Sequence, residues 1–141
     1  MGCSSLSSTQ RTQRSFMPGT IKPICILDDD SSVLTSLQLL LDSDGFEART
    51  FDDSDKFLAY AQLHRIALAV LDVWMPEMNG IEVQERLREL SPDTRVIVMT
   101  GREEAAIRTA ALTGGAFAFL VKPFDDETFL GLVRSALREA A

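Results

Sequence analysis

The sequence predicts an α/β fold in which helices cover both faces of a five-stranded parallel sheet, and two observations support this. First, short apolar runs alternate with helical patterns five times from Ile24 onward, which gives five βα units. Second, most of these runs are apolar almost throughout, as is typical of strands that are buried on both faces. Right-handed crossovers then make the doubly wound open sheet, (βα)5, the most economical topology.

The strands are predicted from these short apolar segments. Four of them are apolar almost throughout, whereas FEARTF alternates apolar and polar residues, as an edge strand does. The predicted strands are ICIL (24–27), FEARTF (46–51), IALAVL (66–71), RVIVMT (95–100) and FAFLV (117–121).

The helices are predicted from capping residues and from apolar residues at helical spacing. Ser31 or Ser32 can cap the first helix, and Gly45 ends it. The second helix, DDSDKFLAYAQL, also begins with residues that favour helix caps. The remaining helices are predicted at residues 80–90, about 102–113 and about 126–139.

Composition and charge exclude several classes of protein. With 141 residues, 45% hydrophobic and 25% charged, the chain has the make-up of one globular domain. No apolar run approaches the ~20 residues that span a bilayer, so we expect no membrane segment. The net charge is −7, and because residues 1–22 hold three basic residues and no acid, the remainder carries −10. So acidic a body argues against direct binding to nucleic acid, whose phosphates need clustered lysines and arginines.

The chain is expected to divide at about residue 22. Residues 1–21 are rich in Ser, Thr and Gln and show no periodicity, so we expect a disordered N-terminal tail before a folded domain at 22–141. The MGCSS start resembles a lipidation signal, but Leu6 stands where Ser or Thr is required. Two cysteines in unlike contexts, without an apolar secretory segment, indicate a reducing cytoplasm.

Carboxylates follow two of the predicted strands. Asp28, Asp29 and Asp30 follow the first strand, and Asp72 follows the third. If these strands are neighbours, as in the flavodoxin-like order 2-1-3-4-5, the carboxylates converge at the edge of the sheet where ligands bind. Like charges so close would force one carboxylate to protonate unless a cation lay between them. Oxygen ligands of this kind suit Mg2+.

The fourth and fifth strands bring two further polar groups to the same edge. Thr100 ends the fourth strand, and Lys122 follows the fifth and precedes Pro123. A lysine after so apolar a run needs a charged partner. A metal ion, a lysine, a hydroxyl donor and a free carboxylate together form a phosphoryl-transfer site that carries its own acceptor.

These motifs resemble those of the response-regulator receiver domain of two-component signalling. The shared pattern is an apolar strand ending in DDD, followed in order by LDVWMPEMNG, VIVMTGRE and GAFAFLVKPF. The resemblance covers about residues 22–140. It implies a receiver domain at 22–141 and a cis peptide bond between Lys122 and Pro123.

The resemblance also implies a reaction and a cofactor. Asp72 would accept a phosphoryl group from the phosphohistidine of a sensor histidine kinase or of a histidine phosphotransfer protein. Mg2+ would be bound directly by Asp29, mainly through water by Asp28, and by Asp72 and the backbone carbonyl of Trp74. We expect the bulky Trp74 side chain to shield the phosphoryl group or to contact a partner.

A switch is implied by three further residues. Lys122 would pair with one phosphoryl oxygen and Thr100 would bind another. Movement of Thr100 would vacate space into which Phe119 could turn, which alters the face formed by the fourth helix, fifth strand and fifth helix (about 102–138). We expect this face to bind a downstream protein or a second copy of the chain. The domain is expected to be no enzyme, beyond phosphorylating itself from a donor and slowly losing the group.

Three arrangements of the signalling output fit a chain of this length. The domain could be a single-domain regulator, a carrier in a phosphorelay, or the receiver part of a longer regulator.

Two other functions compete with this interpretation. ILDDDSS also fits the start of the haloacid-dehalogenase phosphatases, with Asp28 as nucleophile, Asp30 as acid and the pair Asp125–Asp126 for Mg2+. That hypothesis leaves Asp72 without a role. The other competitor is a pseudo-receiver that binds partners without being phosphorylated, but such modules usually lose the acceptor, the acidic pair or the lysine, all of which are present here.

Overall fold

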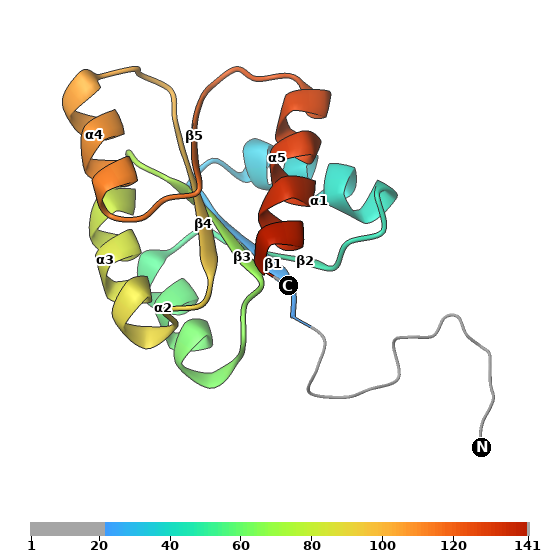
Figure 1. Cartoon of the computed structure of the whole chain (residues 1–141), viewed down its shortest axis with the longest axis horizontal. Coiled ribbons are helices and arrows are strands. Elements are labelled where there is room, and N and C mark those ends of the chain that lie inside the picture. Colours follow the sequence, from blue (N-terminus) through green and yellow to red (C-terminus); the bar gives the residue numbers. More distant parts are fainter. Residues whose placement is uncertain (1–21, 141) are drawn as a thin grey trace.

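The five apolar segments form one parallel sheet with helices on both faces (Figure 1). The computed structural model describes residues 22–140; the predicted N-terminal tail at 1–21 lies outside the described residues. The strand order is β2-β1-β3-β4-β5, so the predicted flavodoxin-like order is confirmed. The strands are β1 (Ile24–Leu27), β2 (Ala48–Phe51), β3 (Leu68–Asp72), β4 (Arg95–Thr100) and β5 (Ala118–Val121).

The helices divide between the two faces of the sheet (Figure 1). The side chains of α1 and α5 share one buried hydrophobic cluster with the sheet, and those of α2, α3 and α4 share the second. This is the layered arrangement predicted from strands that are apolar throughout. The helices are α1 (Ser31–Ser43), α2 (Ser54–Leu63), α3 (Gly80–Leu90), α4 (Ala105–Thr113) and α5 (Asp126–Ala140).

Strand β1 shows why its sequence is apolar at every position. Successive side chains of a strand point to opposite faces, so Ile24 and Ile26 pack in the first cluster while Cys25 and Leu27 pack in the second. All four are buried. Cys25 is thus a core residue, and burial raises the pKa of its thiol to about 12.

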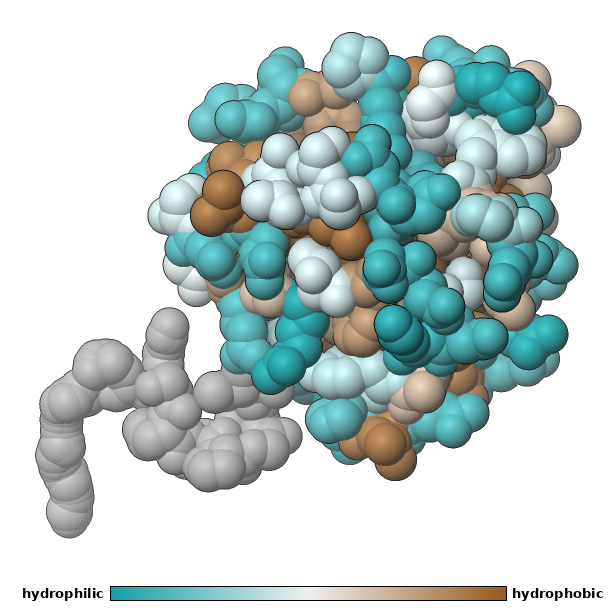
Figure 2. Space-filling model, turned by 180° about the vertical axis from the view of Figure 1, so that it is seen from behind, coloured by the Kyte–Doolittle hydropathy of each residue, from teal (hydrophilic) through white to brown (hydrophobic). Residues whose placement is uncertain are grey.

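The outer surface contrasts with these clusters. Figure 2 shows a mostly hydrophilic face on which hydrophobic areas are small and separated. Within residues 22–140, no helix has both the length and the apolar character needed to cross a bilayer.

Helix α1 begins at an aspartate cap and is followed by a glycine. Asp30 Oδ1 accepts a hydrogen bond from the amide of Ser32 at 2.9 Å, so Asp30 caps α1. The prediction that Ser31 or Ser32 would be the cap was wrong, because the carboxylate just before them reaches this amide first. Gly45 follows the end of α1 with a φ of +87°, a conformation that glycine adopts without strain.

The largest difference from the predicted boundaries lies at α4, which begins at Ala105 and not near residue 102. The Thr100 hydroxyl accepts a hydrogen bond from the amide of Arg102 at 3.1 Å and donates one to the Arg102 carbonyl at 3.0 Å. These bonds hold the backbone of Arg102 in a turn and delay the helix. Smaller shifts occur at β2, which begins at residue 48, and at β3, which spans 68–72.

The register of the sheet fixes where the functional residues lie. Leu27 of β1 lies beside Leu71 of β3, and Thr100 of β4 lies beside Val121 of β5. Because all strands are parallel, the residues that end or follow them gather at one edge. This edge is where the predicted site residues meet.

Gly80 begins α3 against the end of β3, and we predict that it tolerates no side chain. Its amide donates a hydrogen bond to the Val73 carbonyl at 2.9 Å, and an added Cβ would overlap the backbone carbonyl of Asp72. We expect Gly80→Ala to lower the free energy of unfolding by about 2–4 kcal/mol, measured by urea denaturation.

Gly131→Ala on α5 is the matched control. A Cβ there meets no heavy atom within 4 Å, so this change should leave stability equal or raise it by about 0.5–1 kcal/mol. If the two variants were equally stable, the steric argument for Gly80 would be wrong.

Candidate functional site

Three carboxylates meet at the carboxyl edge of the sheet. Asp28 follows β1 and Asp72 ends β3, and both are buried, whereas Asp29 is exposed. One carboxylate oxygen from each residue lies within 4.8 Å of the other two. The sequence predicted this convergence from the neighbouring positions of the two strands, and the structure confirms it.

A single ammonium group lies between the two buried carboxylates. Lys122, which follows β5, places its Nζ 2.7 Å from Asp28 Oδ2 and 3.0 Å from Asp72 Oδ1. Burial opposes the charged form of this lysine, but the hydrogen bonds to Asp28 and Asp72 outweigh that effect and raise its pKa. Lys122 is therefore a fixed positive charge inside the site, as the sequence predicted.

The peptide bond after this lysine has the predicted form. The bond between Lys122 and Pro123 is cis. The amide of Lys122 donates a hydrogen bond to the Thr100 carbonyl at 2.7 Å, which ties the end of β5 to the end of β4.

Asp72 has the most perturbed carboxyl group at the site. Burial raises the pKa of Asp72 to about 6, and the negative charges of Asp28 and Asp29 add to this effect while Lys122 opposes it. The carboxylate remains mostly ionised at neutral pH, so it can act as a nucleophile there.

The charges at this edge suit a divalent cation. Three carboxylates face one ammonium group, so their negative charge is only partly balanced. The atoms that these carboxylates offer to a metal ion are all oxygens. Such a set fits Mg2+, which prefers oxygen ligands and retains waters. Asp28, Asp29 and Asp72 could hold the ion. The fourth predicted ligand, the backbone carbonyl of Trp74, remains a prediction.

Thr100 is buried at the end of β4, and both of its hydroxyl hydrogen bonds go to the backbone of Arg102. The predicted role of this hydroxyl, binding a phosphoryl oxygen, therefore requires these bonds to be exchanged. Thr100 thus lies at the predicted edge of the sheet, but its hydroxyl is bonded to the backbone of Arg102.

Arg102, which the sequence analysis did not single out, contacts two of the predicted site residues, Thr100 and Trp74. Its guanidinium carbon lies 4.4 Å from the centroid of the Trp74 ring, and its Nε lies 3.8 Å from Glu104. Trp74 is 38% exposed, so this stacked pair lies at the surface. The signal was the short spacing from Thr100, since a threonine often binds the backbone two residues on.

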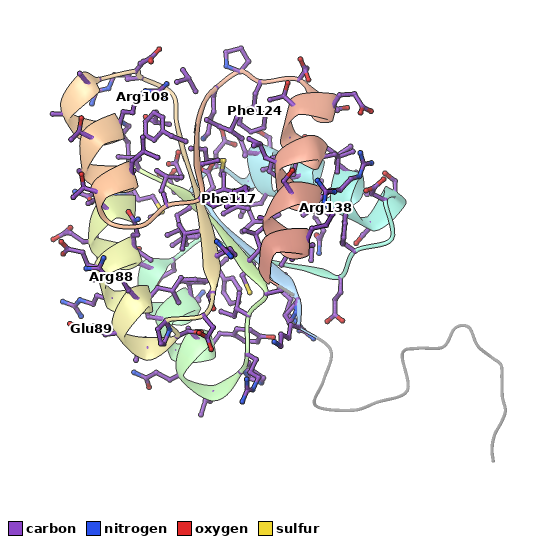
Figure 3. The ribbon with its side chains drawn as sticks, in the orientation of Figure 1. Arg88, Glu89, Arg108, Phe117, Phe124 and Arg138 are labelled. Atoms are coloured by element: carbon purple, nitrogen blue, oxygen red, sulfur yellow. The ribbon has the colours of Figure 1, made fainter. Side chains whose placement is uncertain are left out.

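Phe119 lies on β5 and is partly buried against the second hydrophobic cluster. Arg108 of α4, labelled in Figure 3, lies over its ring with the guanidinium carbon 4.8 Å from the centroid, and Arg108 also pairs with Glu103 at 3.0 Å. Phe119 is thus neither fully in the core nor free on the surface. Its predicted switching movement is untested.

The acidic pair required by the phosphatase hypothesis, Asp125–Asp126, is not part of the carboxylate cluster. Asp125 is exposed, and its carboxylate caps α5 by accepting a hydrogen bond from the amide of Thr128 at 2.7 Å. Asp126 is also exposed, and Asp30 caps α1. These carboxylates have structural roles as helix caps or lie in solvent.

We predict that Asp72→Asn stabilises the protein in the absence of Mg2+. The folded-state pKa of Asp72 lies above its ordinary value, so ionisation of this group costs stability above pH 6, and protonation relieves that cost as the pH falls from 6 towards 4. Urea denaturation at pH 7.5 should show a gain of about 1–3 kcal/mol for the variant, and this gain should shrink at pH 4.5.

Asp53→Asn serves as the control, because Asp53 caps α2, asparagine also caps helices, and Asp53 is not one of the three clustered carboxylates. Addition of Mg2+ should stabilise the wild-type protein more than Asp72→Asn and reduce the difference between them. A gain that grows on acidification would contradict the prediction.

Known proteins share this fold. A CheY-like response regulator receiver protein of Methanospirillum hungatei superposes with a TM-score of 0.82 at 29% identity, over 86% of this chain and 97% of that one. The beryllofluoride-activated NtrC4 receiver domain, solved as a dimer, gives 0.81 at 32% identity, over 84% and 98% of the two chains.

The sequence comparisons identify the family. The chain is 38% identical to the response regulator protein TodT of Pseudomonas putida over 117 residues, which is 83% of this chain and 52% of TodT. It is 36% identical to the transcriptional regulatory protein FixJ of Bradyrhizobium diazoefficiens over 83% of this chain and 57% of FixJ, so it spans about half the length of these relatives. The family model of the response regulator receiver domain matches residues 24–134. The chain therefore belongs to the response regulator receiver domain family of two-component signalling.

Proposed function

We propose that Asp72 is the phosphoacceptor of this receiver domain and that its reaction depends on Mg2+. The phosphoryl donor would be the phosphohistidine of a sensor histidine kinase or of a histidine phosphotransfer protein. One observation carries the proposal: Lys122 bridges Asp28 and Asp72 while Asp29 lies beside them, so nucleophile, cation ligands and a positive charge share one edge.

The chemistry follows from the chain's own groups. A carboxylate oxygen of Asp72 attacks phosphorus, an O–P bond forms, and the P–N bond of the phosphohistidine breaks with its electron pair remaining on the imidazole nitrogen. Lys122 pairs with a phosphoryl oxygen, and the Thr100 hydroxyl donates to another after leaving the Arg102 carbonyl. A bound Mg2+, held by Asp28, Asp29, Asp72 and the Trp74 carbonyl, would supply charge neutralisation for the transferred group.

The signal would pass through the contacts of Thr100. When Thr100 turns to the phosphoryl group, its two hydrogen bonds to the Arg102 backbone are lost, and the loop before α4 is released. Phe119 can then change its packing beneath Arg108. The face formed by α4, β5 and α5 would bind a downstream protein or a second copy of the chain. The dimeric state of the activated NtrC4 receiver supports the second option.

The wider setting is also a proposal. We infer that the domain is no catalyst of turnover, beyond taking up a phosphoryl group and slowly losing it. The matched region covers only 57% of FixJ, which supports an output region in that protein. A single-domain regulator, a relay carrier and the receiver part of a longer regulator all fit the domain described here. A cytoplasmic location is supported by the free thiol of Cys25.

The central test is phosphorylation by a small-molecule donor. Incubation with acetyl phosphate and Mg2+ should add one phosphoryl group, detected by intact mass. Asp72→Asn should gain none, because the amide is not a nucleophile here, and removal of Mg2+ with EDTA should also prevent the gain. Asp53→Asn should be modified like the wild type.

A second substrate separates this function from the phosphatase alternative. A receiver should not turn over p-nitrophenyl phosphate repeatedly, whereas a haloacid-dehalogenase-like phosphatase should release p-nitrophenol at a steady rate. Steady turnover that survives Asp72→Asn would overturn the proposal. Failure of the wild type to gain mass with acetyl phosphate would instead favour the pseudo-receiver.

Trp74 is predicted to protect the phosphorylated form. Trp74 lies two residues after Asp72, and the Arg102 guanidinium lies over its ring. Trp74→Ala should therefore admit water to the acyl phosphate and shorten its half-life by about threefold. The half-life is measured from intact mass after the donor is removed. Leu63→Ala, which changes an 80% exposed leucine at the end of α2, should leave the half-life unchanged. Equal half-lives for Trp74→Ala and the wild type would contradict the prediction.

A further inference from the structure

Helix α4 begins differently from the other helices in the described part of the chain. Glu104 precedes it and makes no side-chain capping hydrogen bond. Residues 101–106 are all exposed. In the other four helices an early amide binds a capping side chain. These capping residues are Asp30, Asp53, Asn79 and Asp125.

The opposite end of α4 is fastened to α3. Gln84 Nε2 donates a hydrogen bond to the Ala111 carbonyl at 2.9 Å, and both residues are buried. Arg88, labelled on α3 in Figure 3, donates from Nη1 to the Gly114 carbonyl at 3.1 Å. Ala111 is the fully buried residue of α4. The helix is thus held at its carboxyl end and weakly held at its amino end.

Gln84 links α3 to α4 and does not only fill space in the core. Its side chain is 3% exposed, and its Oε1 has no hydrogen-bond partner among the described residues. Reversing the amide gives no improvement, because the Ala111 carbonyl only accepts and would then face another acceptor. A buried acceptor without a donor is costly, so an apolar residue would fill this space at lower cost. What the glutamine adds is the bond to α4.

The backbone of α4 closes tightly on this amide. A Cβ at Gly114 would lie 3.0 Å from Gln84 Nε2 and 3.2 Å from the Ala110 carbonyl oxygen. A side chain there would require the glutamine amide or the Ala110 carbonyl to shift by a few tenths of an ångström. The contact therefore depends on both partners, Gln84 of α3 and Gly114 after α4.

We propose that α4 is hinged at its carboxyl end on Gln84 and that its amino end is the part that moves. The moving end follows the Thr100–Arg102 turn directly, so release of that turn would swing the first turn of α4 while Ala111 and Gly114 stay in place. The hinge is a property of the unmodified protein. Only the stimulus that releases the turn rests on the proposed function.

The first test is amide hydrogen exchange of the unmodified protein, measured by NMR. Four hydrogen-bonded amides report on the two ends: Ile107 and Arg108, which bind the Glu104 carbonyl, and Gly114 and Ala116, which bind Ala110 and Ala111. The amides of Gly114 and Ala116 should exchange at least about tenfold more slowly than those of Ile107 and Arg108. Equal rates at both ends, or the reverse order, would overturn the hinge without bearing on phosphorylation.

Gln84→Ala tests the tether itself. Exchange at Gly114 and Ala116 should become about fivefold faster, the change that the loss of one net hydrogen bond gives. Gln38→Ala is the matched control, because Gln38 makes the same kind of bond, from Nε2 to the Ala48 carbonyl at 3.2 Å, on the other side of the sheet. An equal effect of both variants at Gly114 would mean general destabilisation and would overturn the proposal.

Gly114→Ala tests the hinge from the side of α4. The added Cβ should displace the Gln84 amide and speed exchange at Ala116, as Gln84→Ala does. Unchanged exchange at Ala116 in this variant would contradict the proposal, and the wild-type measurement remains decisive if either variant folds poorly.

A final arm uses Mg2+ and beryllofluoride as a phosphoryl mimic. Chemical shifts and exchange should change at Ile107 and Arg108 and stay constant at Gly114 and Ala116. Changes of equal size at both ends would overturn the hinge. If the mimic produced no change near Asp72 either, the proposed function would fail while the result for the unmodified protein would still decide the hinge.

Discussion

The ion pair that Lys122 makes with both Asp28 and Asp72 is the interaction on which the site depends. Each partner is reached from a different strand, so the pair forms only when β1, β3 and β5 are parallel and in register. Burial strengthens this attraction, but it also removes the three charged groups from water, and the two carboxylates repel each other. The sheet supplies the free energy that holds these charges together.

The imbalance of charge makes the site responsive. Burial, with the negative charges of Asp28 and Asp29, raises the pKa of Asp72 to about 6. One ammonium cannot neutralise three carboxylates, so a cation is favoured nearby. A new negative group on Asp72 would compete with Asp28 for Lys122 and attract the Thr100 hydroxyl. A buried core with a highly charged edge is an arrangement in which a local change of charge can select between two conformations.

The same contrast between rigid and loosely held parts runs through the helices. Helices α1, α2, α3 and α5 begin with side-chain caps, and α4 does not. Helix α4 follows Thr100 directly, so the least secured helix start lies next to the residue that would sense the phosphoryl group. Arg108 on Phe119 and Arg102 on Trp74 are surface contacts, which are weaker than core packing and can be exchanged at small cost.

The sequence by itself determined the sheet, its order and the residues at its carboxyl edge, because apolar periodicity and parallel connections leave few other topologies. Asp28, Asp29, Asp72, Thr100 and Lys122 could therefore be predicted from where the strands end. The tertiary structure alone decided how they pair. Whether the Thr100 hydroxyl binds Asp72 or Arg102, and that Gln84 reaches across to Ala111, depends on packing between segments distant in the chain. Local pattern carries no information on such contacts, since a side chain's partner is set by which helix lies beside it.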